Sequence, residues 1–238
     1  LARVVPPRIA GLLARRHEAE GVTLRMGAMV ERFISNGRGA VKAVELSTGE
    51  SLPCDLAVIG VGVAANTALA ADAGLDMDVG IRTDAALRTS DPAIFAIGDV
   101  ATFHHPLYDQ AVRVEAWQNA EDHARVVAAI LAGEAAEAGS VPYFWSDQYD
   151  LSLQIVGLPH LGSSVVTRTR KDGAAILFHL DPGGRIVGAT GLGTAGSIGR
   201  DIRLTQMLIA QRAHPDRTLL KDPEGRLRSL VDPHAAPP

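Results

Sequence analysis

The sequence has little cysteine and no long apolar run. Cys54 is the single cysteine among 238 residues. One cysteine cannot form an internal disulfide, a Cys-x-x-Cys redox pair or a cysteine-rich metal site, so we expect no metal and no dithiol chemistry in this stretch. A reducing compartment, the cytoplasm, is the expected location. No apolar run approaches the roughly 20 residues that a membrane-spanning helix needs, so no membrane partner is expected.

The charge balance excludes another class of partner. The formal net charge is −4, and nucleic-acid binding would favour a basic surplus. The apolar fraction of 47% and the charged fraction of 21% are typical of a globular protein with an ordinary core. The chain begins at Leu1 rather than at a methionine, and we expect it to be part of a longer protein.

The first half of the chain alternates between strand and helix patterns. Pro6-Pro7 starts a predicted helix that Gly21 ends. A continuous apolar run at residues 56–60 predicts a strand buried on both faces. Further segments are expected as strands at residues 22–25, 29–34, 41–46 and, in part, 83–90, and as a helix at residues 66–73. This alternation predicts an α/β layer.

The second half becomes rich in strands. A short strand is expected at residues 94–97, a loop at residues 104–113, and a long helix that Asn119 caps and that runs to Leu131, with Gly133 beyond its end. Turns of glycine and proline then separate the remaining expected elements: strands at 151–156, 164–168, 174–179 and 185–189, and a helix at 198–211.

The most informative stretch is residues 89–99, with the sequence TSDPAIFAIGD. Its apolar end delivers a glycine and then a carboxylate. Gly98 lets a ligand approach the backbone closely, and Asp99 can accept a hydrogen bond from a sugar or polyol hydroxyl. For a bare Gly-Asp pair, a strand-end turn capped by aspartate would be the better explanation, but the eleven-residue stretch is more specific.

Residues 89–99 resemble the second FAD motif of the flavoprotein reductases that have two dinucleotide-binding domains, within the pyridine nucleotide-disulfide oxidoreductase superfamily. This resemblance implies that Asp99 binds the ribityl chain of FAD, beside Gly98. Residues 114–120, VEAWQNA, resemble the segment beside the flavin ring of ferredoxin and rubredoxin reductases. It implies that Trp117 contacts FAD through its backbone and that Glu115 lies near the ring and the nicotinamide.

Residues 144–148, FWSDQ, resemble the start of the C-terminal domain of these reductases. The family that the chain resembles is the putidaredoxin reductase-like family. The resemblance implies that Trp145 lies close to the flavin, on the side where electrons leave. A flat amphipathic ring there can pack on the edge of the flavin. The alternative is that Trp145 is an aromatic residue of the core.

Two glycine-rich loops need separate interpretations. Residues 60–65 fit G-x-G-x-x-A, and the resemblance places Gly60 and Gly62 at the end of the NAD domain, in contact with NAD(P)H. A structural turn is the alternative. Residues 191–196 fit G-x-G-x-x-G, but no alternating βαβ unit follows, so we interpret them as a tight turn between a strand and a helix.

Several charged and polar residues have a less specific pattern. His104, His105 and His123 have no accompanying ligand cluster, and we expect loop histidines rather than a metal site. The C-terminal part is locally basic, which could steer an acidic ferredoxin or only form a solvated surface. The residues concerned are Arg168, Arg170, Lys171, Arg200 and Arg203.

The resemblance implies the following fold: an α/β protein, a partial two-dinucleotide-binding-domain (FAD/NAD(P)) flavoprotein reductase with an α+β C-terminal domain. Its expected domains are residues 1–75, the C-terminal part of the NAD(P)-binding domain; 76–141, the returning segment of the FAD-binding domain; and 142–238, the C-terminal interface domain.

The implied activity is that of an NAD(P)H-dependent ferredoxin or rubredoxin reductase, of the EC 1.18.1 type, in an oxygenase or P450 electron-transfer chain. FAD and NAD(P)H are the implied cofactors, and the choice between NADH and NADPH stays open. A homodimer is considered. The alternatives are a non-catalytic dimerisation or docking module, and a related NADH oxidase, nitrite reductase component or peroxide-reducing flavoenzyme.

Overall fold

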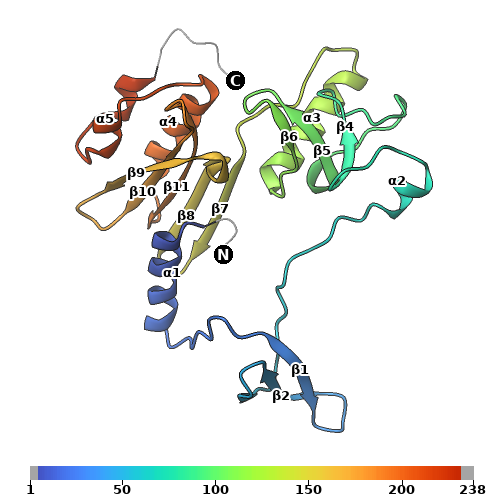
Figure 1. Cartoon of the computed structure of the whole chain (residues 1–238), viewed down its shortest axis with the longest axis vertical. Helices are drawn as coiled ribbons and strands as arrows, with labels where there is room; N and C mark the ends of the chain where they lie inside the picture. The colour runs from blue at the N-terminus through green and yellow to red at the C-terminus, as the bar shows by residue number, and fades with distance from the viewer. Residues whose placement is uncertain (1–4, 232–238) are drawn as a thin grey trace. The chain divides into compact units, whose positions relative to one another are not determined.

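The computed structural model describes residues 5–231 and shows two compact units. One unit is Gly11–Ala64, and the other combines the described residues before Gly11 with those from Ala65 onward. Helix α1 (Pro7–Ala19) contains the boundary between them (Figure 1). The predicted helix after Pro6 and its end at Gly21, which has φ +85°, are confirmed.

The unit Gly11–Ala64 holds a three-stranded antiparallel sheet in the order β1-β2-β3. Its strands are β1 (Val30–Ser35), β2 (Val41–Leu46) and β3 (Ser51–Pro53). Asn36 closes the β1–β2 turn because its Oδ1 accepts a hydrogen bond from the N–H of Arg38 at 2.8 Å. The two predicted strands of this hairpin are therefore confirmed, whereas residues 22–25 form no strand.

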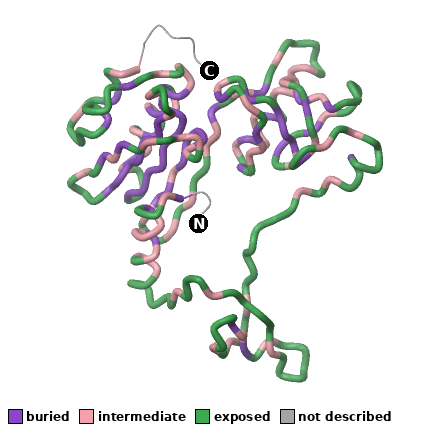
Figure 2. The backbone as a smooth tube through the Cα atoms, viewed as in Figure 1, coloured by how far each residue is buried: buried purple, intermediate pink, exposed green. Residues whose placement is uncertain are grey.

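The predicted buried strand at residues 56–60 is wrong. These residues have no regular secondary structure, and Leu56 and Val58 are 79% and 91% exposed. Figure 2 shows this stretch as an almost continuously exposed tube. An apolar run becomes a buried strand only when neighbouring strands take its hydrogen bonds on both edges. None of the described strands pairs with it.

In the second unit, helix α2 (Ala68–Asp72) is shorter than the helix expected at residues 66–73. A three-stranded sheet follows in the order β4-β5-β6, with β4 parallel to β5 and β6 antiparallel to it. Its members are β4 (Ile81–Thr83), β5 (Ala101–His105) and β6 (Gln110–Val112). The loop expected at residues 104–113 is therefore a hairpin.

Residues 94–97 do not form the expected strand, and a single bridge joins Arg88 to Phe95. The preceding residues fold back on themselves: Asp91 Oδ1 accepts from Ala93 N at 2.9 Å, and Thr89 N donates to the carbonyl of Ile94 at 2.9 Å. This local turn uses backbone groups that a strand would pair with a neighbour. The stretch then ends in the 3₁₀ turn η1 (Gly98–Val100).

Helix α3 (Trp117–Leu131) begins two residues before the predicted cap. Asn119 lies inside the helix, and its Nδ2 donates to the carbonyl of Val114 at 3.1 Å instead of accepting from a backbone N–H. The prediction of Asn119 as the N-cap is therefore wrong. The predicted C-terminal end is confirmed, because Gly133 follows the helix with φ +88°.

The C-terminal part is a five-stranded antiparallel sheet in the order β7-β8-β11-β10-β9 (Figure 1). Its strands are β7 (Tyr143–Gln148), β8 (Leu151–Gly157), β9 (Ser164–Thr169), β10 (Ala175–Leu180) and β11 (Ile186–Thr194). The accompanying helices are η2 (Pro159–Leu161), α4 (Gly199–Ala210), α5 (Arg217–Lys221) and η3 (Leu227–Leu230). The four predicted strands and the helix near residues 198–211 are confirmed.

Strand β11 runs further than predicted and contains the first two glycines of the G-x-G-x-x-G pattern. A Cβ on Gly191 would lie 2.9 Å from Ile198 Cδ1 and from Ile202 Cδ1. A Cβ on Gly193 would lie 2.4 Å from the hydroxyl of Ser197. Because these two glycines have no side chain, the start of α4 packs directly on the strand. Only the end of the glycine pattern, after β11, forms a turn.

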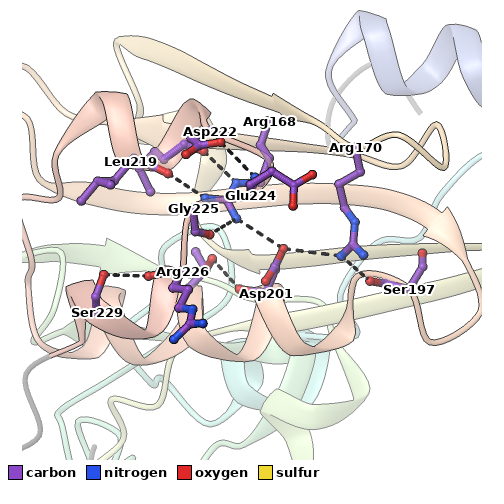
Figure 3. A network of polar contacts seen from close by, with 12 residues as sticks. Arg168, Arg170, Ser197, Asp201, Leu219, Asp222, Glu224, Gly225, Arg226 and Ser229 are labelled. Carbon is purple, nitrogen blue, oxygen red and sulfur yellow. Dashed lines mark hydrogen bonds and ion pairs between the residues drawn. The ribbon is translucent and has the colours of Figure 1, made fainter.

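Arg168 is not part of a solvated basic surface, as the sequence allowed, because its side chain is 2% exposed. It donates to the carbonyls of Leu219, Leu220 and Gly225 at 2.7, 2.9 and 3.2 Å, and Figure 3 shows this network. Oδ2 of Asp201 lies 3.6 Å from Nη1 of Arg168. Burial lowers the pKa of Arg168, while Asp201 and Asp222 oppose this shift, and a guanidinium stays charged. Arg168 thus ties the segment around α5 to β9.

His105 and His123 are not loop histidines, because they are 0% and 2% exposed in β5 and α3. His179 on β10 is also buried, at 6% exposed, and its Nε2 has no hydrogen-bond partner among the described residues. Burial lowers the pKa of His179 to about 4, from an ordinary 6.5. A neutral imidazole in an apolar place avoids the cost of a buried charge.

Replacing His179 with leucine is expected to flatten the dependence of stability on pH. The folded-state pKa is depressed, so the unfolded chain takes up the proton first as pH falls below 6.5. Wild-type stability should therefore fall by about 2 kcal/mol more than that of His179→Leu between pH 7 and pH 5. Urea unfolding at several pH values measures this. His104→Gln, at an exposed side chain, is the control, and parallel curves for wild type and His179→Leu would contradict the prediction.

Candidate functional site

A pocket of about 690 Å³ in the second unit brings together five of the seven residues predicted for the site. These are Gly98, Asp99, Glu115, Trp117 and Trp145. The pocket lies where η1, the start of α3 and strand β7 meet. Its remaining lining residues are Ile97, Ala116, Ala120, Tyr143 and Phe144. The volume is in the range of cofactor and small-molecule sites.

One wall of the pocket is the η1 turn. Gly98 has φ +71°, and a Cβ there would lie 3.3 Å from the Cβ of Ala120, so glycine is needed for both the conformation and the close approach to α3. Asp99 follows with an exposed side chain. Its carboxylate has no hydrogen bond or ion pair within the described part of the chain, and it is free to accept hydrogen bonds from a ligand.

Another part of the pocket lining is aromatic. Trp117 and Trp145 meet edge to face with ring centroids 5.9 Å apart, and Tyr143 stacks on Trp145 at 5.7 Å. Both tryptophans are well exposed, at 64% and 42%. Exposed aromatic surface gathered around one pocket marks a binding site for an apolar or flat ligand. Trp145 is therefore not a core residue, which was the alternative at the sequence level.

Helix α3 presents its N-terminal end to the same pocket. Ala116 and Trp117 line the pocket, Ala116 offers no side-chain cap, and the first turn has no acidic residue. The first N–H groups of a helix have no partner within the helix and carry a partial positive charge. An electron-rich oxygen of a ligand can accept hydrogen bonds there.

Arg113 is a site residue that the sequence reasoning missed. Its Nη1 donates to the carbonyl of Asp99 at 2.9 Å, and its Nη2 lies 2.7 Å from Oε1 of Glu115. The guanidinium thus connects the η1 turn to the segment before α3 and balances the charge of Glu115. The sequence contains one indication of this pair: Arg113 and Glu115 are two residues apart, a spacing that places both side chains on one face of an extended segment.

Gly60 and Gly62 belong to the other unit, in the stretch without regular structure. Gly62 has φ +99°, a conformation that favours glycine. A Cβ on Gly60 would meet no atom within 4 Å. Their contact with NAD(P)H stays a prediction.

Among residues 5–231, no helix is long and apolar enough to cross a bilayer. Within the same residues, no group of three or more histidine, cysteine, aspartate or glutamate side chains could hold a metal ion.

Two family models together match most of the chain. Residues 1–124 match the model described as pyridine nucleotide-disulphide oxidoreductase, and residues 143–231 match the model described as reductase C-terminal. The two matches follow one another along the chain, and both describe oxidoreductase domains. The chain belongs to the pyridine nucleotide-disulphide oxidoreductase family. The resemblance and the fold class predicted from the sequence are confirmed.

Individual relatives show which reductases the chain is similar to. The chain is 40% identical over 232 residues to the ferredoxin–NAD(+) reductase component of the anthranilate 1,2-dioxygenase system of Burkholderia cepacia, covering 97% of this chain and 56% of the relative. It is 38% identical over 157 residues to the rubredoxin–NAD(+) reductase of Ectopseudomonas oleovorans, covering 66% of this chain and 40% of the relative. The crystal structure of a covalent putidaredoxin reductase–putidaredoxin complex matches with TM-score 0.89 and 34% identity, covering 97% of this chain and 54% of that chain. The chain thus spans about half the length of these relatives.

Proposed function

We propose that the chain is part of an FAD-dependent reductase that passes electrons from NAD(P)H to a ferredoxin or a rubredoxin. The observation that carries the proposal is the pocket that Asp99 and the two tryptophans line together. The relatives named as ferredoxin–NAD(+) and rubredoxin–NAD(+) reductases support the choice of acceptor, and they favour NADH over NADPH.

The residues of the pocket fit a flavin. Asp99 offers an unpaired carboxylate to polyol hydroxyls, and the exposed rings of Trp117 and Trp145 offer flat apolar surface to a ring system. The uncapped end of α3 offers N–H groups to a ring oxygen. FAD bound there would supply the link between hydride transfer from NAD(P)H and single-electron transfer, chemistry that no side chain provides.

The side chains of this chain have the remaining tasks. Asp99 would bind the polyol, with Gly98 permitting the close approach. Arg113 holds the backbone of Asp99 and pairs with Glu115. Trp117 and Trp145 exclude water from one side of the pocket. Trp145 lies on β7 at the pocket edge, and we assign to it the side from which electrons leave.

The domain limits and the location belong to the same proposal. Residues 1–75 would belong to the NAD(P)-binding domain, 76–141 to the FAD-binding domain and 142–238 to the interface domain. A single cysteine suits the reducing cytoplasm. A homodimer is the remaining hypothesis about assembly.

A steady-state assay of the full-length protein tests the proposal. With NADH as donor, we expect reduction of ferredoxin or rubredoxin, followed by visible absorbance. Trp145→Ala should raise the KM for the protein acceptor several-fold, because a lost aromatic contact is worth about 0.5–1.5 kcal/mol. With FAD added to saturation, ferricyanide, a small acceptor, should still be reduced at nearly the wild-type rate.

A colourless, well-folded dimer without NADH oxidation would contradict the proposal and favour the docking module. Rapid oxidation of NADH by oxygen alone, with no response to either protein acceptor, would favour an NADH oxidase.

A further inference from the structure

We propose that His123 is a positioning residue that holds the Gly98–Asp99 turn in the conformation required for FAD. The inference rests on the proposed function, since it concerns the same pocket. His123 lies on α3 and does not line the pocket. Its Nδ1 accepts a hydrogen bond from the N–H of Gly98 at 3.1 Å, and this bond joins two segments that are 25 residues apart.

The direction of this bond determines the state of the ring. A backbone N–H can only donate, so Nδ1 of His123 must be unprotonated and any ring proton must lie on Nε2. Burial lowers the pKa of His123 to about 4, with Asp122 opposing the shift and His105 adding to it. The acceptor is therefore available at neutral pH.

The surroundings of the ring show that packing alone does not explain a histidine here. The ring is 2% exposed and meets Phe103 edge to face, with centroids 4.9 Å apart. Its Nε2 is buried and has no hydrogen-bond partner among the described residues. A buried polar group without a partner is costly, and an apolar side chain of similar size would avoid that cost. The bond to Gly98 is the polar contact that histidine provides.

The bond is made by the residue that begins the turn. Gly98 has φ +71° and begins η1, so its peptide orientation decides where the next residue, Asp99, projects. Arg113 holds the carbonyl of Asp99, on the far side of the same residue. His123 and Arg113 therefore hold the backbone on both sides of the Asp99 side chain.

Two substitutions in the full-length protein test this role. His123→Leu keeps the bulk and removes the acceptor, whereas His123→Asn places an amide oxygen near the position of Nδ1. We expect the dissociation constant for FAD to be about tenfold higher in His123→Leu than in wild type. His123→Asn should recover most of the lost affinity. Stability in urea should fall little in His123→Leu. His179→Leu removes another buried histidine, on β10 and outside the pocket lining, and should leave FAD affinity unchanged.

The outcomes separate this inference from the proposed function. Wild-type protein that binds no FAD would overturn both. Wild-type protein that binds FAD no more tightly than His123→Leu, or equal losses in the leucine and asparagine variants, would overturn only the role of His123. If His123→Leu fails to fold, the ¹⁵N chemical shifts of the wild-type ring still decide: a proton on Nδ1 would overturn the role, and a proton on Nε2 supports it.

Discussion

Replacing Asp99 with alanine is expected to yield full-length protein that purifies almost free of FAD. The carboxylate of Asp99 has no partner in the described part of the chain, and its substitution should cost the fold little. A hydrogen bond to a charged group contributes about 1.5–3 kcal/mol, so the loss corresponds to about 10- to 150-fold weaker binding. Titration of the apoprotein with FAD, followed by flavin fluorescence, measures the change.

Two further variants make this test specific. Asp99→Asn keeps a hydrogen-bond acceptor and loses the charge, so its affinity for FAD should lie between those of wild type and Asp99→Ala. Asp147→Ala removes another exposed carboxylate, on β7 outside the pocket lining, and should bind FAD as wild type does. Undiminished FAD binding by Asp99→Ala would refute the assignment of this pocket to the flavin.

Replacing Arg168 with methionine is expected to destabilise the C-terminal part by about 3–5 kcal/mol, the usual cost of removing one partner from a buried ionic site. Methionine keeps much of the apolar stem, but it removes the guanidinium that lies over the ring of Phe178 and pairs with Asp201. It also leaves three backbone carbonyls without their donor. Buried acceptors without a partner are the main source of the loss. Urea unfolding followed by tryptophan fluorescence measures it.

Arg170 offers the matched control. Its side chain is 36% exposed, and its contacts with Asp172 and Asp201 are long, at 3.6 and 3.8 Å. Its firmest bond is to the carbonyl of Ser197 at 2.9 Å. Arg170→Met should therefore cost about 1 kcal/mol or less. Equal effects of the two substitutions would show that Arg168 is not the residue that fastens the α5 segment to the sheet.

Four of the five strands of the C-terminal sheet, β8 to β11, could be predicted because polar turns separate them, whereas β7 was not predicted. Neighbouring strands such as β7 and β8, or β9 and β10, are joined through short polar turns, and these turns are visible as glycine, proline and aspartate in the sequence. Residues 56–60 have an equally clear apolar pattern but no strand pairs with them. The apolar run by itself does not indicate whether distant strands will pair with it.

The hairpin of β5 and β6 was mistaken for a loop for a related reason. Its strands are short, and two histidines and an aspartate obscure the alternation of apolar residues. His105 is nevertheless fully buried, because its ring nitrogens meet the carbonyl of Ser140 and the N–H of Leu107. The type of residue alone does not predict such burial, since distant backbone groups satisfy the ring.

The sequence by itself determined the family, four of the five strands of the C-terminal sheet and five of the residues that line the pocket. The pocket residues could be predicted because Gly98, Asp99 and Trp145 occur in short contiguous motifs. Only the tertiary structure showed that these motifs meet, that Arg168 is buried, and that Arg113 and His123 hold the backbone around Asp99. The physical reason is that a supporting hydrogen bond joins groups whose separation along the chain carries no recurrent pattern. Its existence depends on packing between elements, which a local pattern does not contain.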